Sequence, residues 1–134
     1  MDTIEIRLDV PRRGVVNLDA HVSTFLEGKG DGLLSVFAPH ATAGLAIIET
    51  GAGSPDDLMD AIDQLLPRDD RWRHSHGSPG HGADHVLPGF ISPSVTVPVV
   101  GGRAALGTWQ SIVLVDPNAD NPHRTIRLSF LASS

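Results

Sequence analysis

Cysteine is absent from all 134 residues of the chain. Its absence excludes disulfide bonds and any metal site built on thiolate ligands. A metal ion bound by this chain must therefore be held by histidine, aspartate, glutamate, backbone oxygen or water. Histidine is the ligand type that the sequence concentrates, because four of its seven histidines lie between His74 and His85.

Basic residues are also scarce. Lysine and arginine together number 10 against 16 acidic residues, the net charge is -6, and the single lysine is Lys29. No block of basic residues occurs. Nucleic acids and anionic membranes both require a basic face on their protein partners. The composition therefore predicts no nucleic-acid partner and no membrane partner.

Long hydrophobic runs are missing as well. No apolar stretch approaches the roughly 20 residues of a membrane-spanning helix. The N-terminus lacks the basic start and apolar run of a signal peptide. Apolar residues make up 40% and charged residues 19% of the chain, values typical of a globular domain. We expect one domain spanning residues 1–134, located in the cytoplasm.

The hydrophobic pattern predicts mostly β-strands. Ile4, Ile6 and Leu8 alternate with charged residues, a period of two that is typical of a half-buried strand, and Pro11 is predicted to break it. The turn at Gly101-Gly102 indicates a hairpin. Further strands are predicted at 33–38, 45–48, 95–99, 104–106, 109–115 and 125–131. The total is about seven strands.

Two or three helices complete the prediction. Ser54 is a good N-cap residue, Pro55 suits the first helical position, and the helix should end before Pro67. Its predicted buried face consists of Leu58, Ala61, Ile62, Leu65 and Leu66. Shorter helices are predicted from Asp19, burying Val22, Phe25 and Leu26, and from His85. The fold class is therefore α+β and mostly antiparallel.

The segment from Arg73 to His85 contains four histidines together with three glycines and one proline. Glycine and proline at this density predict a loop. Neutral imidazole is a good ligand for zinc, copper, nickel and iron, so the loop is a candidate metal site. The alternative is a solvated loop whose histidines titrate near pH 6.5 and do nothing else.

Several motifs occur in a fixed order between about Leu33 and Arg127. They are His40-Ala-Thr42-Ala43, Glu49, Trp72-Arg-His74, Ala83-Asp-His85, Val97-Pro-Val99, Gly102-Arg103 and Leu106-Gly-Thr-Trp-Gln110. Together they resemble the YjbQ-like family, labelled "secondary thiamine-phosphate synthase enzyme". The Leu-Gly-Thr-Trp-Gln string is the most specific of these motifs.

The resemblance implies a YjbQ-like antiparallel β-sandwich that assembles as a homotrimer, with a pocket near the subunit interface. It also implies a histidine-based site for a divalent metal, zinc being the expected ion, with His40, His74 and His85 as ligands. His81 departs from the family pattern, which more often has asparagine there. We expect His81 to be an exposed imidazole and His76 not to be a ligand.

The residue types suit such a site. Three neutral imidazoles leave a cation its full charge and an open position. Glu49 is a candidate general base or partner of the ligands. Gln110 is a second candidate catalytic residue. The candidate substrate-binding residues are Thr42, Arg103, Trp109 and Arg124, and Trp109 is expected to be a core or pocket-wall aromatic.

Three functions are consistent with these residues. The family name implies an enzyme that joins a pyrimidine methyl diphosphate to a thiazole phosphate, with loss of diphosphate. Dedicated synthases of that kind are (β/α)₈ barrels of roughly 250 residues, so this activity is expected to be weak. The alternatives are a metal-dependent hydrolase of a small phosphorylated substrate and a non-catalytic module that binds a metal or metabolite.

Overall fold

The computed structural model describes residues 1–10 and 13–134; Pro11 lies outside these ranges. In the described residues the strands form two antiparallel sheets, accompanied by three α-helices. The elements in chain order are β1 (Asp2–Asp9), β2 (Gly14–Asn17), α1 (Asp19–Leu26), β3 (Gly32–Phe37), β4 (Gly44–Ile48), α2 (Ser54–Leu65), α3 (His81–Val86), the 3₁₀ turn η1 (Leu87–Gly89), β5 (Ser94–Val100), β6 (Arg103–Ala104), β7 (Ser111–Asp116) and β8 (His123–Ala132). The predicted α+β class with antiparallel strands is confirmed.

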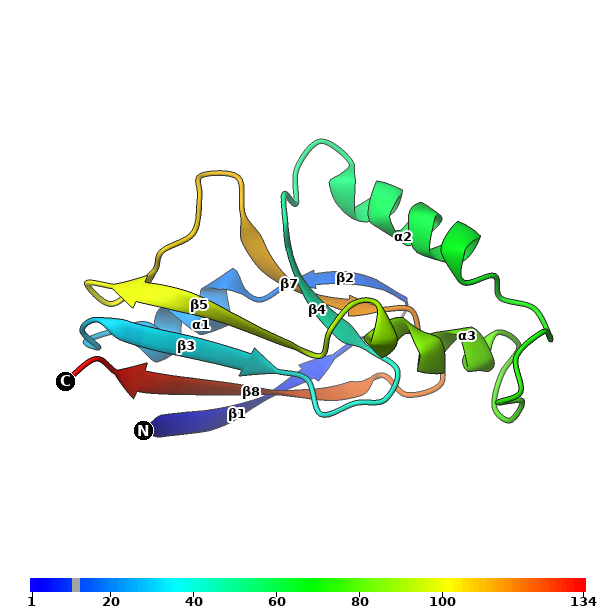
Figure 1. The fold of residues 1–134 in the computed structure, drawn as a ribbon, viewed down its shortest axis with the longest axis horizontal. Helices are drawn as coiled ribbons and strands as arrows, with labels where there is room; N and C mark the ends of the chain where they lie inside the picture. The colour runs from blue at the N-terminus through cyan, green and yellow to red at the C-terminus, as the bar shows by residue number, and fades with distance from the viewer. Residues whose placement is uncertain (11–12) are drawn as a thin grey trace.

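One sheet has five strands in the order β1-β8-β3-β5-β6, and the other has three in the order β2-β7-β4 (Figure 1). The predicted hairpin joins β5 to β6, where Val100 pairs with Arg103. Both turn residues have positive φ, +58° at Gly101 and +77° at Gly102, which glycine adopts without steric cost. The returning strand has two residues, not the three predicted.

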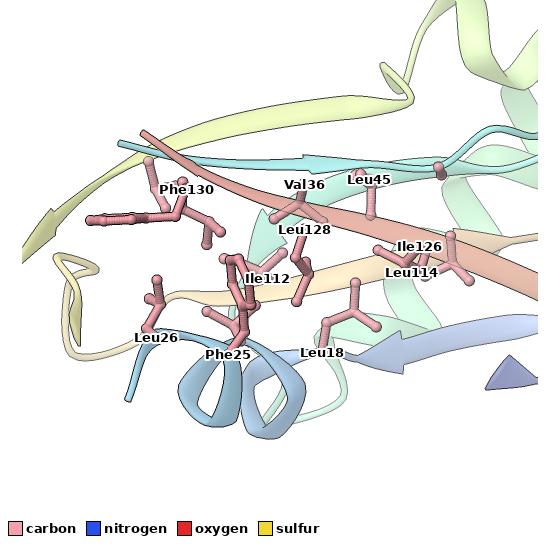
Figure 2. Packing of buried hydrophobic residues seen from close by; sticks show 14 of the residues in the cluster. Leu18, Phe25, Leu26, Val36, Leu45, Ile112, Leu114, Ile126, Leu128 and Phe130 are labelled. Carbon is pink, nitrogen blue, oxygen red and sulfur yellow. The ribbon is translucent and has the colours of Figure 1, made fainter. Parts of the chain in front are cut away.

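The main hydrophobic core lies between the two sheets. Alternate residues of the five-stranded sheet, such as Val36 and Leu128, point inward and are fully buried. They pack against Ile112 and Leu114 from β7, while Phe25 of α1 closes one side of this core (Figure 2). The period-two pattern of these strands therefore reflects one buried face and one outward face.

β7 is covered on both faces. Its residues between Ile112 and Val115 are all fully buried, as expected for a strand that lies between two packing layers. Val113 and Val115 belong to a second cluster, together with Ile62 of α2 and Leu87. The chain therefore has three layers, formed by the five-stranded sheet, the three-stranded sheet, and α2 with α3.

α2 differs from the prediction in two details. Gly53, with φ +83°, precedes the helix, and the Ser54 side chain makes no capping hydrogen bond. Ala61 and Leu65, both predicted to be buried, are exposed, Leu65 by 59%. The apolar face of this segment packs through Leu58, Met59, Ile62 and Leu66 instead. Among the helices of the described ranges, none is long and apolar enough to cross a membrane.

Candidate metal centre

Four histidines come together at the end of the molecule that carries α3, opposite the chain termini (Figure 1). His74, His76, His81 and His85 each place one ring nitrogen within 4.8 Å of the others. The His74 and His85 rings stack with centroids 3.8 Å apart, and those of His74 and His76 are 4.1 Å apart. We call these four residues the histidine cluster.

Two backbone periods produce the cluster. His81 and His85 lie four residues apart on α3, so they share one face of the helix, and their Nε2 atoms are 2.9 Å apart. His74 and His76 come from the non-helical segment before α3 and are spaced two apart, the spacing of residues on one side of an extended chain. The loop between these pairs brings them face to face.

That loop depends on glycine at position 77. Gly77 has φ +84°, and a Cβ atom there would lie 2.8 Å from Cγ of His81 and 2.9 Å from Oδ2 of Asp120. Both the backbone conformation and the close approach exclude larger residues. The glycines that indicate a loop in the sequence are therefore also what lets His81 approach the rest of the cluster.

Two buried ring nitrogens in the cluster have no hydrogen-bond partner in the described residues. Nε2 of His74 and Nδ1 of His81 are buried, and neither forms a hydrogen bond within the described part of the chain. His81 Nδ1 does lie 2.9 Å from Oδ2 of Asp120, without the alignment of a hydrogen bond. Buried polar atoms usually have a partner. A set of clustered imidazole donors is the chemistry that zinc, copper and nickel favour.

The surroundings of two rings in the cluster favour their neutral form. Burial lowers the pKa of His74 and of His85, and the neighbouring imidazoles lower both pKa values further. A neutral ring retains a nitrogen lone pair, and metal binding requires that lone pair. The lowered pKa values of His74 and His85 therefore favour the form of these two rings that binds a metal ion.

A cavity of about 340 Å³ adjoins the cluster. Its walls include Trp72, His74, His76 and His81, so a small molecule in the cavity would contact the rings directly. α3 is fastened beside it by Asp84, which is 1% exposed and ion-pairs with Arg68. Burial raises the pKa of Asp84, although Arg68 opposes that shift.

His40 is not part of the histidine cluster within one chain. Its Nε2 accepts a hydrogen bond from the backbone N–H of Thr125 at 2.9 Å. Burial and the nearby Arg124 lower its pKa. Of the three predicted ligands, the chain therefore brings together His74 and His85 without His40, and it adds His76 and His81.

Thr42 and Arg124 belong to a separate buried group that also contains Asp116 and Asn118, which we call the arginine network. Arg124 donates to both carboxylate oxygens of Asp116, at 2.7 and 2.8 Å, and to Oγ1 of Thr42 at 2.9 Å. Asn118 donates to the same hydroxyl at 3.3 Å. Within the chain these side chains bind one another, and neither Thr42 nor Arg124 lines the cavity beside the histidine cluster.

Glu49 directly follows β4 and Gln110 directly precedes β7, so both lie at the same end of the three-stranded sheet. The last pair that joins β4 to β7 at that end is Ile48 with Ser111. The other end of the same strand pair leads into the arginine network. The five residues of β4 separate the two ends by roughly 17 Å.

Trp109 and Arg103 are both exposed, and neither lines the cavity at the histidine cluster. Trp109 is 73% exposed, so its predicted place in a core or pocket wall is wrong within one chain. Arg103 sits on the β5–β6 hairpin, far from α3 in Figure 1, and lines a separate cavity of about 490 Å³ with Asp19 and Glu27.

The sequence prediction of an exposed His81 is also wrong. This residue is 9% exposed and contacts both His85 and Asp120. The i, i+4 spacing of His81 and His85 is a signal that was present in the sequence, but it indicates a shared face only if the helix begins at His81. Asp120 has no comparable signal, because its contact depends on the folding of a distant loop.

Comparison with known proteins assigns the family. The family model described as "UPF0047 protein YjbQ-like" matches residues 3–133. The chain is 63% identical over 131 residues to UPF0047 protein Rv2556c of Mycobacterium tuberculosis, with 98% of both chains covered. It is 30% identical over 124 residues to a UPF0047 protein of Archaeoglobus fulgidus, covering 92% of this chain and 97% of that protein.

Solved structures agree with this assignment. Hypothetical protein APE1520 of Aeropyrum pernix is 33% identical, with a TM-score of 0.89 and coverage of 99% of this chain and 100% of that one. A YbjQ-like protein of unknown function from Sulfolobus solfataricus, 24% identical, shares the fold with a TM-score of 0.91 over 98% of this chain and 97% of that one. The chain belongs to the YjbQ-like, or UPF0047, family.

Proposed function

We propose that this chain is a metal-binding protein in which His74, His76, His81 and His85 hold one divalent transition-metal ion. One observation carries the proposal: one ring nitrogen from each of four imidazoles lies within 4.8 Å of the others, and the buried Nε2 of His74 has no hydrogen bond in the described structure. The donors are all nitrogen, so calcium and magnesium, which prefer oxygen ligands, are disfavoured. Zinc is the ion we propose.

We further propose that the metal serves an enzyme acting on a small phosphorylated metabolite. A bound divalent cation would polarise a phosphoryl oxygen or lower the pKa of a water molecule. The adjoining cavity of about 340 Å³ is at the small end of the range for ligand pockets, roughly 300–1,000 Å³. The reaction is either a thiamine-phosphate synthase-like transfer or a hydrolysis.

The number of imidazoles bound to the ion distinguishes a catalytic metal site from a structural one. Zinc sites with four protein ligands are structural, whereas catalytic sites keep one position open. His76 is exposed and lies next to Gly77, so we propose that it is the ligand that leaves. A substrate in the cavity would then take its position.

We propose that a neighbouring copy of the chain supplies Glu49 and Gln110, because within one chain they lie at the far end of the three-stranded sheet. The outer face of the five-stranded sheet supports association between copies, since Leu33, Phe37 and Leu131 are all exposed there. The homotrimer implied by the family would bury such a face. Sedimentation equilibrium measures the number of copies directly.

The experiment begins with protein purified without a histidine tag or chelator. Its metal content is measured by mass spectrometry, for the wild type, for His81→Ala and for the exposed control His123→Ala. We expect bound zinc in the wild type and control and loss of zinc in His81→Ala. Metal-free wild-type protein that does not take up added zinc would contradict the proposal.

Turnover is then tested with thiamine precursors and with simple phosphate esters. Activity that disappears with chelator and returns with zinc supports the enzyme. Subunit mixing tests the shared site: Glu49→Gln and His81→Ala are each expected to be inactive, and co-assembled mixtures should regain activity. Metal binding without turnover of any such substrate favours the non-catalytic module.

A further inference from the structure

Asp120 connects the histidine cluster to the rest of the protein. Its Oδ2 lies 2.9 Å from Nδ1 of His81 and accepts a hydrogen bond from the backbone N–H of Ser78 at 3.1 Å. Asp120 lies in the segment between β7 and β8, whereas Ser78 and His81 belong to the histidine loop and α3. One carboxylate therefore accepts a hydrogen bond from the loop and lies at ion-pair distance from the ring.

The orientation of the His81 ring follows from this contact. Nδ1 faces Asp120, so Nε2 faces the other members of the cluster and lies 2.9 Å from Nε2 of His85. A carboxylate beside Nδ1 favours the tautomer that carries its proton on Nδ1. The lone pair of His81 is then on Nε2, directed at the cluster.

We infer that Asp120 is the positioning residue of the metal centre, fixing the ring orientation and tautomer of His81 so that its Nε2 lone pair points at the ion. The inference rests on the proposed function, since it assumes that the cluster holds a metal. A carboxylate that accepts a hydrogen bond from a ligating histidine raises the basicity of that ligand. Asp120 would not contact the metal itself.

Asp120 is in turn held by the arginine network. Its backbone N–H donates to Oδ1 of Asn118 at 3.1 Å, and the backbone N–H of Asn118 donates to Oδ1 of Asp116 at 3.1 Å. Asp116 is the buried partner of Arg124. Thr42 and Arg124 therefore support the metal centre indirectly, by fixing the segment that carries Asp120.

The test compares Asp120→Asn and Asp120→Ala with the control Asp9→Asn. Asp9 Oδ1 also lies 2.9 Å from a histidine Nδ1, that of His123, but this pair is exposed and outside the cluster. Zinc affinity is measured by competition with a chromophoric chelator. The tautomer of His81 is read in metal-free protein from long-range ¹H–¹⁵N NMR spectra, a quantity that a purely structural role of Asp120 would not change.

We expect both Asp120 variants to bind zinc about 10- to 100-fold more weakly than wild type and Asp9→Asn to bind unchanged. The Nδ1–H tautomer of His81 should dominate in wild type and be lost in Asp120→Ala. Wild-type zinc affinity in both Asp120 variants, with wild-type protein binding zinc, would overturn the inference and leave the proposed function standing. Failure of wild-type protein to bind zinc would remove the proposed function, and this inference with it.

Discussion

Two polar groups stand close together in this fold and differ in how their atoms are satisfied. In the arginine network, Arg124 and Asp116 are 3% and 0% exposed in their side chains, and they pair with each other and with Thr42. In the histidine cluster, two buried ring nitrogens have no hydrogen bond within the residues described. The paired group stabilises the fold, and the unpaired group is suited to bind something else.

The largest expected effect is a loss of folding stability when the arginine network is broken. Arg124→Met leaves the fully buried Asp116 carboxylate without its partner, which typically costs about 3–5 kcal/mol. The control is Arg127→Met, also on β8, whose partner Glu5 is 45% exposed; an exposed pair contributes about 0–1 kcal/mol. Urea denaturation of both variants measures the difference. Equal losses would show that burial does not distinguish the two ion pairs.

The second largest expected effect is on zinc affinity. A substitution in the histidine cluster should weaken zinc binding more than it lowers stability, the opposite of a substitution in the arginine network. His81→Ala removes a proposed ligand. Its loss of zinc affinity should therefore exceed the roughly 10- to 100-fold loss expected when a residue that only contacts a ligand is removed. The metal-free variant should lose much less stability than Arg124→Met. Competition titration gives the affinity and urea denaturation gives the stability. A large loss of stability with unchanged zinc affinity would make His81 a structural residue like Arg124.

Metal removal should destabilise the wild type by a smaller amount. A ligand at 100 times its dissociation constant stabilises a protein by about 2.7 kcal/mol. Chelation should therefore lower the unfolding temperature by several degrees, and added zinc should restore it. Differential scanning calorimetry measures both steps. The same chelation should leave the unfolding temperature of His81→Ala almost unchanged.

The smallest effect is the pH dependence of the metal-free protein. The pKa values of His74 and His85 are lowered in the fold, so at pH values just below about 6.5, the ordinary histidine pKa, the unfolded chain binds more protons than the folded one. Acidification through that window therefore lowers stability. Urea denaturation at pH 7.5 and pH 5.5 tests the sign. Double replacement His74→Ala/His85→Ala should reduce the dependence.

Most of the strands were predictable because their information is local, although β2 (Gly14–Asn17) was not predicted. The alternation of Ile4, Ile6 and Leu8 depends only on which face of one strand is buried, and β1 forms there. Trp109 was not predictable in the same way. Trp109 begins the predicted strand 109–115, but β7 begins at Ser111. The exposure of a residue just before a strand depends on the loop that leads into it.

The candidate site was predicted in part. The family motifs identified His74 and His85, which the chain brings together, but motifs do not give distances in space. His40 instead binds Thr125, on a strand whose position follows from long-range pairing. The register of β4 against β7 likewise decides that Glu49 and Gln110 lie at the end away from the arginine network. Spacing along the sequence carries no record of that register.

The assignment of the metal ligands is tested by measuring zinc stoichiometry and affinity for tag-free wild type, His40→Ala, His81→Ala and His85→Ala. We predict one zinc ion per chain in the wild type, its loss in the His81 and His85 variants, and its retention in His40→Ala. Wild-type affinity in both cluster variants, or no zinc uptake by the wild type, would contradict this assignment.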